Sequence, residues 1–469
     1  MGKNYGINIK LARMFYLAFI RSVIDYHALH LAMYKESHIE KLDKVQNEAM
    51  RLILGAPMSA RIVNMRTELN LPSIYERVLY INTTFGVKAL REPVYFTKFQ
   101  RQLKLKITQP HHQLEPGTLC SGTWLQSMSS CVLRLNIPID KILRGRTIPP
   151  WKIRNMDVHY INVPKKDSVP GTLIKQYALA NIDDHLETVG EVYLCYTDGS
   201  LQLWGPAGCA CVVYKYDVIQ YQNSIRIHDW ASTTQAELAG MHLATEFLQS
   251  KGSGVIFCDS QSALQAMNSF GNSPDKIVTD IRLNVLRASR SNFVIHFIWL
   301  PSHIAIARHD LADKLAREAC TKPDVDMDLG IPLARVKHAQ VRSNKEDLQD
   351  LRNSQRPASI SVKHYDQYVN VRFIYGTHKA RTRQCDIVTA RIRLGYRHIW
   401  QVNETGNVEY TKCKLCDAEF KHTLEHYIAE CHVIEPFRPP NKRYQEICDF
   451  FTNTDVLEDI LALYPKFAM

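Results

Sequence analysis

The pattern of apolar and polar positions changes character near residue 190. Up to about residue 105, apolar residues recur at helical spacing, as in LDKVQNEAMRLILG, which Gly55 and Pro57 bring to a stop. From residue 190, the runs EVYLCYTD, GCACVVYKYDV and YQNSIRIHD alternate like strands. Helical stretches then alternate with two further strands, GVIFCD and FVIHFIWL. A three-strand meander followed by alternating helices and strands predicts an α/β domain built on one mixed sheet.

These changes divide the chain into four predicted regions. Residues 1–105 and 322–469 are expected to be mainly helical, and residues 190–321 carry the α/β pattern. Residues 106–189 are punctuated by prolines, which predicts a linker with some local packing.

Two predicted strands end in an acid where the alternation requires an apolar side chain. Asp198 continues the apolar face of EVYLCYTD, and Asp259 continues that of GVIFCD. In the helix TTQAELAGMHLATEFLQSKG, Glu237 shares the sheet-facing side with Met241. Asp313 is predicted at the start of the last helix of this region, DLADKLAREAC. Four elements of one sheet domain therefore carry an acid toward its core side.

Each of these acids alone has an ordinary structural explanation. Asp198, which precedes Gly199, reads by itself as a turn residue. Four such acids are harder to explain in that way, because each buried carboxylate costs several kcal/mol unless it is compensated. Carboxylate oxygens suit Mg²⁺ or Mn²⁺, and two ions about 4 Å apart would fit a phosphoryl-transfer site.

The order and context of these acids resemble the type 1 ribonuclease H family. YTDGS, TQAEL, FCDS and WLPSHIAIARHDLADKLA carry the resemblance over residues 190–321. It implies a ribonuclease H-like fold and hydrolysis of the RNA strand of RNA–DNA hybrids, with the 2′-hydroxyl distinguishing RNA from DNA. It further implies that His303 assists proton transfer or product release. The four metal-binding carboxylates implied by the resemblance are Asp198, Glu237, Asp259 and Asp313.

The same region departs from the family in two places. The usual Gly-x-x-Gly-Asn-Glu stretch after the histidine reads AIARHD here, which removes both glycines from the loop that carries His303. The polar residues before the glutamate, which contact the minor groove of the hybrid in some relatives, are Thr233, Thr234 and Gln235. They can still hydrogen-bond a 2′-hydroxyl.

A second candidate metal site lies near the C-terminus, in CKLCDAEFKHTLEHYIAEC. Its C-x₂-C-x₉-H-x₄-C spacing suits a closed tetrahedral Zn²⁺ site, and a set of reduced, buried cysteines is the alternative. His422 competes with His426 as a ligand. LEHYIAEC resembles the ending found downstream of ribonuclease H in insect-type retroelements, which favours His426. The predicted zinc-knuckle ligands are Cys413, Cys416, His426 and Cys431.

The regions around the α/β domain point to a retroelement. LAFIRSVIDYHALHLAMYKESHIEKLDKVQNEAMRLILGAP resembles the segment after the palm in non-LTR, jockey-like reverse transcriptases. The (Phe/Tyr)-Ala-Asp-Asp hairpin of a polymerase is missing, and Asp183-Asp184 reads as a helix cap, so no DNA synthesis is expected. A full-length polymerase is therefore a candidate partner. In TARIRLGYRHIWQ, the arginines Arg391, Arg393 and Arg397 either contact nucleic acid or line a solvated helix.

Composition narrows the class of protein. The 469 residues carry a net charge of +11, and residues 1–105 hold 16 Lys and Arg against 8 Asp and Glu. This excess favours a nucleic-acid partner, although a solvated helical surface would also account for it. No apolar run is long enough to predict a membrane span, and no secretory leader is recognisable, so the twelve cysteines are expected as intracellular thiols or metal ligands. The alternatives to an active nuclease are a nucleic-acid-binding remnant with impaired cleavage and a relic without a selected role.

Overall fold

The computed structural model describes most of the chain. The described residues are 6–90, 156–164, 169–202, 205–269, 275–302, 304–369, 382–395, 411–420 and 423–468, together with positions 97, 98, 101, 134, 135, 141 and 375. Contacts divide the chain into two compact units, each built from separate stretches of sequence. The α/β unit contains residues 84–104 and 136–339, and the helical unit contains residues 1–83, 105–135 and 340–469. Among the described residues, no helix is both long and apolar enough to cross a bilayer.

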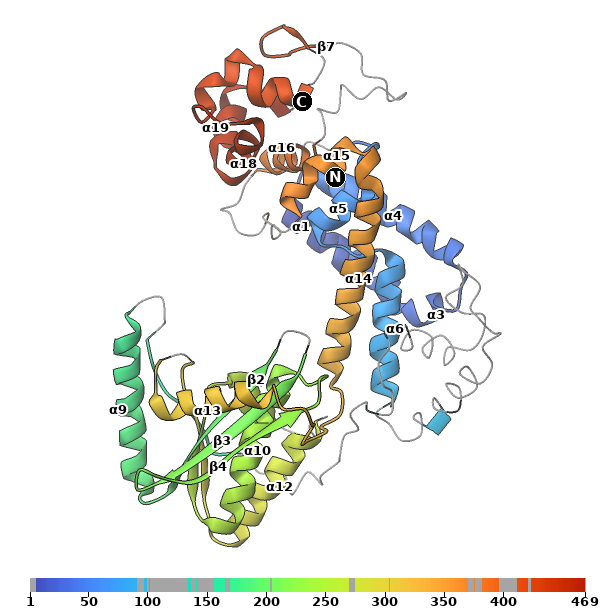
Figure 1. Cartoon of the computed structure of the whole chain (residues 1–469). Helices are drawn as coiled ribbons and strands as arrows, with labels where there is room; N and C mark the ends of the chain where they lie inside the picture. Colours follow the sequence, from blue (N-terminus) through green and yellow to red (C-terminus); the bar gives the residue numbers. More distant parts are fainter. Residues whose placement is uncertain are drawn as a thin grey trace. The chain divides into compact units, whose positions relative to one another are not determined.

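The α/β unit is built on the predicted mixed sheet (Figure 1). The strand order is β1-β6-β5-β2-β3-β4. β2, β3 and β4 form the antiparallel meander, and β5, β6 and β1 add parallel strands beside β2. The strands are β1 (Val158–Tyr160), β2 (Tyr193–Leu201), β3 (Ala207–Lys215), β4 (Val218–Ile227), β5 (Gly254–Cys258) and β6 (Ile295–Trp299).

Helices cover both faces of this sheet. One face packs against α10 (Thr233–Lys251), α11 (Gln261–Asn268) and α12 (Lys276–Arg290) through a buried apolar core. The other face packs against α9 (Gly171–Val189) and against the segment that enters α13 (Ala307–Ala319). The central strands are therefore buried on both sides, which explains why β3 and β5 are almost continuously apolar.

Two elements of this unit come from the range that the sequence predicted as a linker. β1 pairs in parallel with β6, and α9 presents Ile174, Ala178 and Ile182 to the sheet. The parallel partner of β1 lies more than 130 residues further along the chain, so no local pattern could reveal the pairing. Asp183 and Asp184 are exposed residues inside α9, and they form neither a hairpin nor a helix cap.

The helical unit joins the two ends of the chain. All or part of the following helices belong to it: α1 (Ile9–Phe15), α2 (Ser22–Tyr26), α3 (Ala28–Leu31), α4 (Glu36–Leu54), α5 (Ile62–Leu69), α6 (Ile74–Leu90), α14 (Leu333–Gln355), α15 (Ile360–Tyr365), α16 (Arg383–Leu394), α17 (Thr423–Glu425), α18 (Tyr444–Asn453) and α19 (Val456–Leu463). A two-stranded ribbon pairs β7 (Thr411–Lys412) with β8 (Glu419–Phe420). The terminal regions that the sequence separated therefore pack as one unit.

The arginines of α16 hold this unit together. Arg391 donates to the carbonyl oxygen of Gly55 at 3.0 Å, just after the C-terminal end of α4. Arg393 forms a bidentate ion pair with Glu68, at 2.8 and 3.0 Å. Both arginines are buried, so they are not available to contact nucleic acid, and Arg397 lies outside the described residues.

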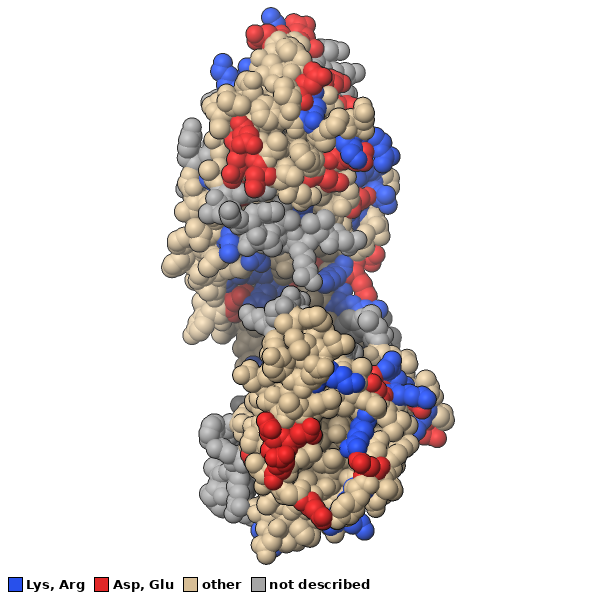
Figure 2. Space-filling view, turned by 90° about the vertical axis from the view of Figure 1, so that its left-hand side faces the viewer, with Lys and Arg blue, Asp and Glu red and all other residues tan. Residues whose placement is uncertain are grey.

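On the face drawn in Figure 2, basic and acidic side chains are interspersed.

Candidate metal sites

Asp198 and Asp259 lie on neighbouring parallel strands of the α/β unit. β2 pairs with β5 with Tyr196 opposite Phe257, so continuing this register by two residues brings Asp198 beside Asp259. Two side chains fix the strand ends: the Thr197 hydroxyl donates to the carbonyl oxygen of Phe257 at 3.1 Å. The Trp299 indole N–H donates to the carbonyl oxygen of Asp259 at 2.9 Å. The period-two prediction thus placed both acids at one end of the sheet.

Glu237 reaches the same place from α10. A capping box between Ser232 and Gln235 fixes the start of this helix, and Glu237 is its fifth residue. Gly199 makes the approach possible, because a Cβ on this residue would lie 2.3 Å from the amide nitrogen of Glu237. The Glu237 carboxylate then lies 3.9 Å from the Cys258 sulfur and is only 6% exposed. The glycine after Asp198 therefore allows α10 to pack close to β2, which brings Glu237 beside the ends of the strands.

Asp313 comes from α13, but not from the position that the sequence predicted. The helix begins at Ala307, six residues before Asp313, so the acid lies in its second turn. Ile306, the residue before the helix, provides no side-chain cap, and this is why no cap signal revealed the start. Asp313 forms an ion pair with Arg317, one turn further along. Its charge acts on Asp198 and Glu237, and α13 packs on the face of the sheet opposite α10.

The four carboxylates repel one another. Burial, followed by the charges of Asp259 and Asp313, raises the pKa of Asp198 from 3.8 to about 7. Burial and the charges of Asp198 and Asp259 raise the pKa of Glu237 well above its ordinary value. The Gly199 amide, which hydrogen-bonds both carboxylates, and Arg317, which faces Asp198, act in the opposite direction without cancelling these shifts. Such a site gains free energy from a bound cation.

His309 joins this group although the sequence gave it no role. Ligand atoms of Asp198, Asp259 and His309 all lie within 4.8 Å of one another. A second overlapping set, with the same spacing, contains Glu237, Cys258 and Asp259. His309 precedes Asp313 by four residues on α13, so the two share a helix face. That i, i+4 spacing was the signal that could have identified it.

The remaining predicted residues of this site have different outcomes. His303 lies outside the described residues. Thr233 is exposed at the start of α10, and Thr234 lies 3.2 Å from the Ser262 hydroxyl. Gln235 does not face the surface: it is 1% exposed, and its side-chain amide donates to the carbonyl oxygen of Gly330 at 3.2 Å. Its part in the capping box therefore replaces the predicted substrate contact.

The four predicted zinc ligands also converge, in the helical unit. Their ligand atoms lie within 4.8 Å of one another, and His422 lies outside the described residues. The sulfur atoms of Cys413 and Cys431 are 3.9 Å apart, and Cys416 Sγ lies 3.3 Å from His426 Nε2. Burial opposes ionisation of Cys413, but the amides of Cys416 and Leu415 outweigh it and lower the pKa of this thiol. Three sulfur atoms and one imidazole suit tetrahedral Zn²⁺.

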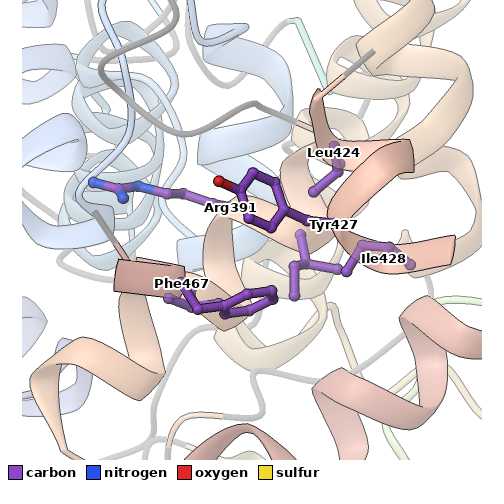
Figure 3. A pocket seen from close by; sticks show the side chains of 7 residues that line it. Arg391, Leu424, Tyr427, Ile428 and Phe467 are labelled. Carbon is purple, nitrogen blue, oxygen red and sulfur yellow. The ribbon is translucent and has the colours of Figure 1, made fainter. Parts of the chain in front are cut away.

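An apolar core supports this cluster from below. Tyr427 follows the predicted ligand His426, and its hydroxyl oxygen accepts a hydrogen bond from the Lys414 amide at 3.1 Å. Figure 3 shows its ring at a small pocket beside Phe467, with ring centroids 5.7 Å apart. Tyr427 therefore ties the loop between the first two cysteines to the packed helices.

Comparison with known proteins identifies the central domain. Residues 190–321 match the family model for RNase H and form an RNase H domain. A comparison with curated protein sequences found no match.

Solved structures with similarity to part of this chain include proteins from a bacterium and a virus. The N-terminal RNase H domain of Rv2228c from Mycobacterium tuberculosis, solved as a fusion with maltose-binding protein, is 22% identical, with 28% of this chain and 94% of that chain covered and a TM-score of 0.24. The native protease–reverse transcriptase of prototype foamy virus is 21% identical, with 29% and 21% covered and a TM-score of 0.25. A foamy viral protease–reverse transcriptase in complex with dsDNA is 21% identical, with 28% and 96% covered and a TM-score of 0.24.

Proposed function

We propose that residues 190–321 are a metal-dependent endonuclease that hydrolyses the RNA strand of RNA–DNA hybrids. The observation that carries the proposal is the convergence of Asp198, Glu237, Asp259 and Asp313 from four elements, which raises the pKa values of Asp198 and Glu237. Arg317 pairs with Asp313, but the pKa of Asp198 stays raised in its presence. The match of residues 190–321 to the RNase H family supports the same reaction class.

The donor set fits Mg²⁺ or Mn²⁺. Asp198, Glu237, Asp259 and Asp313 would hold these ions, because hard carboxylate oxygens are the donors that Mg²⁺ and Mn²⁺ prefer. Bound ions would supply a polarised water and neutralise charge on the leaving 3′-oxygen. The chain itself contributes a rigid frame: strand pairing fixes the two aspartates, and the capping box fixes Glu237.

Substrate recognition would use groups near the start of α10. Thr233 is exposed and Thr234 is half-buried, and both hydroxyls are within a few residues of Glu237. A hydroxyl there can hydrogen-bond the 2′-hydroxyl that distinguishes RNA from DNA. His303 is proposed to assist proton transfer or product release from the loop before α13.

The rest of the chain is proposed to come from a non-LTR retrotransposon. The helical region 1–105 would correspond to the part of the reverse transcriptase that follows the palm, and residues 413–431 to a zinc knuckle holding one Zn²⁺. DNA synthesis is not part of this proposal, because the polymerase carboxylate hairpin is missing from the sequence. A full-length retroelement polymerase is the proposed partner.

Cleavage of a labelled hybrid by the full chain tests this function. We expect Mg²⁺-dependent cuts in the RNA strand, none in a DNA duplex, and none after chelation of the metal. Asp259→Asn should abolish cleavage, whereas Asp324→Asn, which removes an exposed acid of the same unit, should not. Cleavage by the Asp259 variant at the wild-type rate would contradict the proposal. Binding of the hybrid without cleavage by the wild-type chain would instead identify a nucleic-acid-binding remnant.

A further inference from the structure

A third cluster of possible ligands lies in the α/β unit, away from the carboxylates. It consists of His159 on β1, His185 on α9 and His296 on β6, and one ring nitrogen of each lies within 4.8 Å of the other two. The ring centroid of His185 lies 4.5 Å from that of His159 and 5.3 Å from that of His296. Three imidazoles from three separate elements therefore meet at one point.

The fold brings these rings together through two regular patterns. Val158 pairs with Phe297, so the register places Asp157 beside His296, and His159 shares the face of Asp157 by the period of two. His185 continues the sheet-facing stripe Ile174–Ala178–Ile182 of α9 by one more turn. An imidazole thus occupies a position where an apolar side chain would continue the core.

Asp157 links two of the rings. One of its carboxylate oxygens lies 2.8 Å from His159 Nε2, and the other lies 2.6 Å from His296 Nδ1. Metal-ligating histidines commonly have their second ring nitrogen held by a carboxylate in this manner. The Nε2 atom of His185 is buried without a hydrogen-bond partner among the described residues. The cluster therefore has a carboxylate close to two of its rings, and the buried His185 Nε2 and His296 Nδ1 have no hydrogen-bond partner among the described residues.

We propose that His159, His185 and His296 bind one transition-metal ion of the Zn²⁺ class, with Asp157 orienting two of the rings. Imidazole nitrogens suit Zn²⁺, Cu²⁺ or Ni²⁺ and do not suit Mg²⁺. Tetrahedral Zn²⁺ with Zn–N bonds of about 2.0–2.1 Å holds its nitrogens about 3.4 Å apart, so small ring rotations close the site. The side chain of His159 is 45% exposed, which leaves the fourth position to solvent.

This ion would be structural and independent of the proposed nuclease. His296 is the second residue of β6, His159 is the middle residue of β1 and His185 lies on α9, whereas Asp259 follows the C-terminal end of β5. The ion would fasten β1 and α9, which precede residue 190, to a strand of the RNase H domain. A metal bound by these histidines would thereby secure the extension without contacting the carboxylates, which belong to separate sets of ligand atoms.

Metal content and spectroscopy of the full chain test this proposal. Wild-type protein prepared without chelator should hold about two Zn²⁺, one at the Cys₃His cluster and one at the histidines. His185→Gln should lower the content by about one, and His242→Gln, a half-buried histidine of α10 outside the cluster, should not. After exchange with Co²⁺, the thiolate charge-transfer band should persist in His185→Gln and disappear in Cys413→Ser.

Hydrogen exchange supplies a readout that is independent of metal counting. Zn²⁺ should slow amide exchange of β1 and α9 by at least about tenfold in the wild type and leave His185→Gln unchanged. If His185→Gln fails to fold, His159→Gln provides the same test at a more exposed edge position. Equal zinc content and equal exchange in the wild type and both variants would overturn the proposal.

Discussion

Two buried acid sites in this protein solve the same electrostatic problem in opposite ways. In the helical unit, Glu68 receives two hydrogen bonds from Arg393, at 2.8 and 3.0 Å, and two from the hydroxyls of Tyr365 and Tyr375, at 2.6 and 2.5 Å. Burial acts to lower the pKa of Arg393, but Glu68 outweighs it and raises that pKa above its ordinary value. In the α/β unit, Asp198 and Glu237 face other acids instead.

The contrast shows how a buried acid can be assigned a role. A carboxylate whose partners all come from its own chain is a structural element, because its charge is already balanced. The charge of a carboxylate that is surrounded by further carboxylates is relieved by a proton or by a cation from solution. A carboxylate balanced by its own chain destabilises the fold when one of its partners is removed. A carboxylate surrounded by other carboxylates destabilises the fold when its cation is removed.

The largest expected effect comes from neutralising the unbalanced site. Asp198→Asn should lower the rate of hybrid cleavage by about 10³-fold, equivalent to about 4 kcal/mol, because one donor of the metal site is lost. Single-turnover cleavage in saturating Mg²⁺ measures the effect. A variant that retains the wild-type rate would remove the distinction between the two acid sites.

The balanced site should respond in stability rather than in activity. Glu68→Gln removes the charge that compensates buried Arg393, so we expect a loss of about 3 kcal/mol in the free energy of unfolding of the helical unit. Hydrogen exchange of α5 and α16 measures this loss. Cleavage by the α/β unit should be unchanged, and a stability equal to the wild type would show that the Glu68 charge is not needed.

The Asp198 site should also make the stability of the α/β unit depend on pH. Asp198 has a folded-state pKa raised to about 7, above the 3.8 of an ordinary aspartate, so the folded protein holds a proton that the unfolded chain releases. Without Mg²⁺, stability of the α/β unit should therefore fall as pH rises from about 4 to about 7. We expect a loss of about 4 kcal/mol, because each pKa unit corresponds to about 1.4 kcal/mol. Asp198→Asn should flatten this slope, and Mg²⁺ should offset it.

The smallest expected effect concerns His309. A nitrogen donor beside Asp198 and Asp259 favours Mn²⁺ over Mg²⁺, so His309→Asn should lower the ratio of Mn²⁺-supported to Mg²⁺-supported cleavage by about fivefold. His242→Asn is the matched control, because it removes a histidine outside the site. An unchanged metal preference would show that His309 does not act as a ligand.

Most of the α/β domain and of its acid site was predictable, because strand alternation and helical spacing are local signals. Asp198, Asp259 and Glu237 each broke a regular apolar pattern, and the structure brings all three together. The predicted start of α13 was wrong, because Ile306, the residue before the helix, has no side chain that could cap it. This error concealed the helix face that His309 and Asp313 share.

Prediction was weaker in the helical unit, where long-range packing decides which face is buried. The spacing of apolar residues correctly indicated α4, yet Val45 and Leu52 of that pattern are exposed. Gln46 is buried instead, and its side-chain oxygen accepts hydrogen bonds from Tyr16 and Arg21. Arg391 and Arg393 resembled surface residues because their partners, Gly55 and Glu68, lie more than 300 residues away in sequence. No local pattern carries that information.

Whether the RNase H domain can fold separately from the rest of the chain depends on the short strand β1. β1 covers the outer edge of β6, where the Phe297 amide donates to the carbonyl oxygen of Asp157 at 2.8 Å. A fragment trimmed to residues 190–321 would leave this edge without a partner, together with the apolar sheet surface that α9 covers. We expect such a fragment to self-associate edge to edge, so a well-behaved fragment that contains the RNase H domain should begin before Met156.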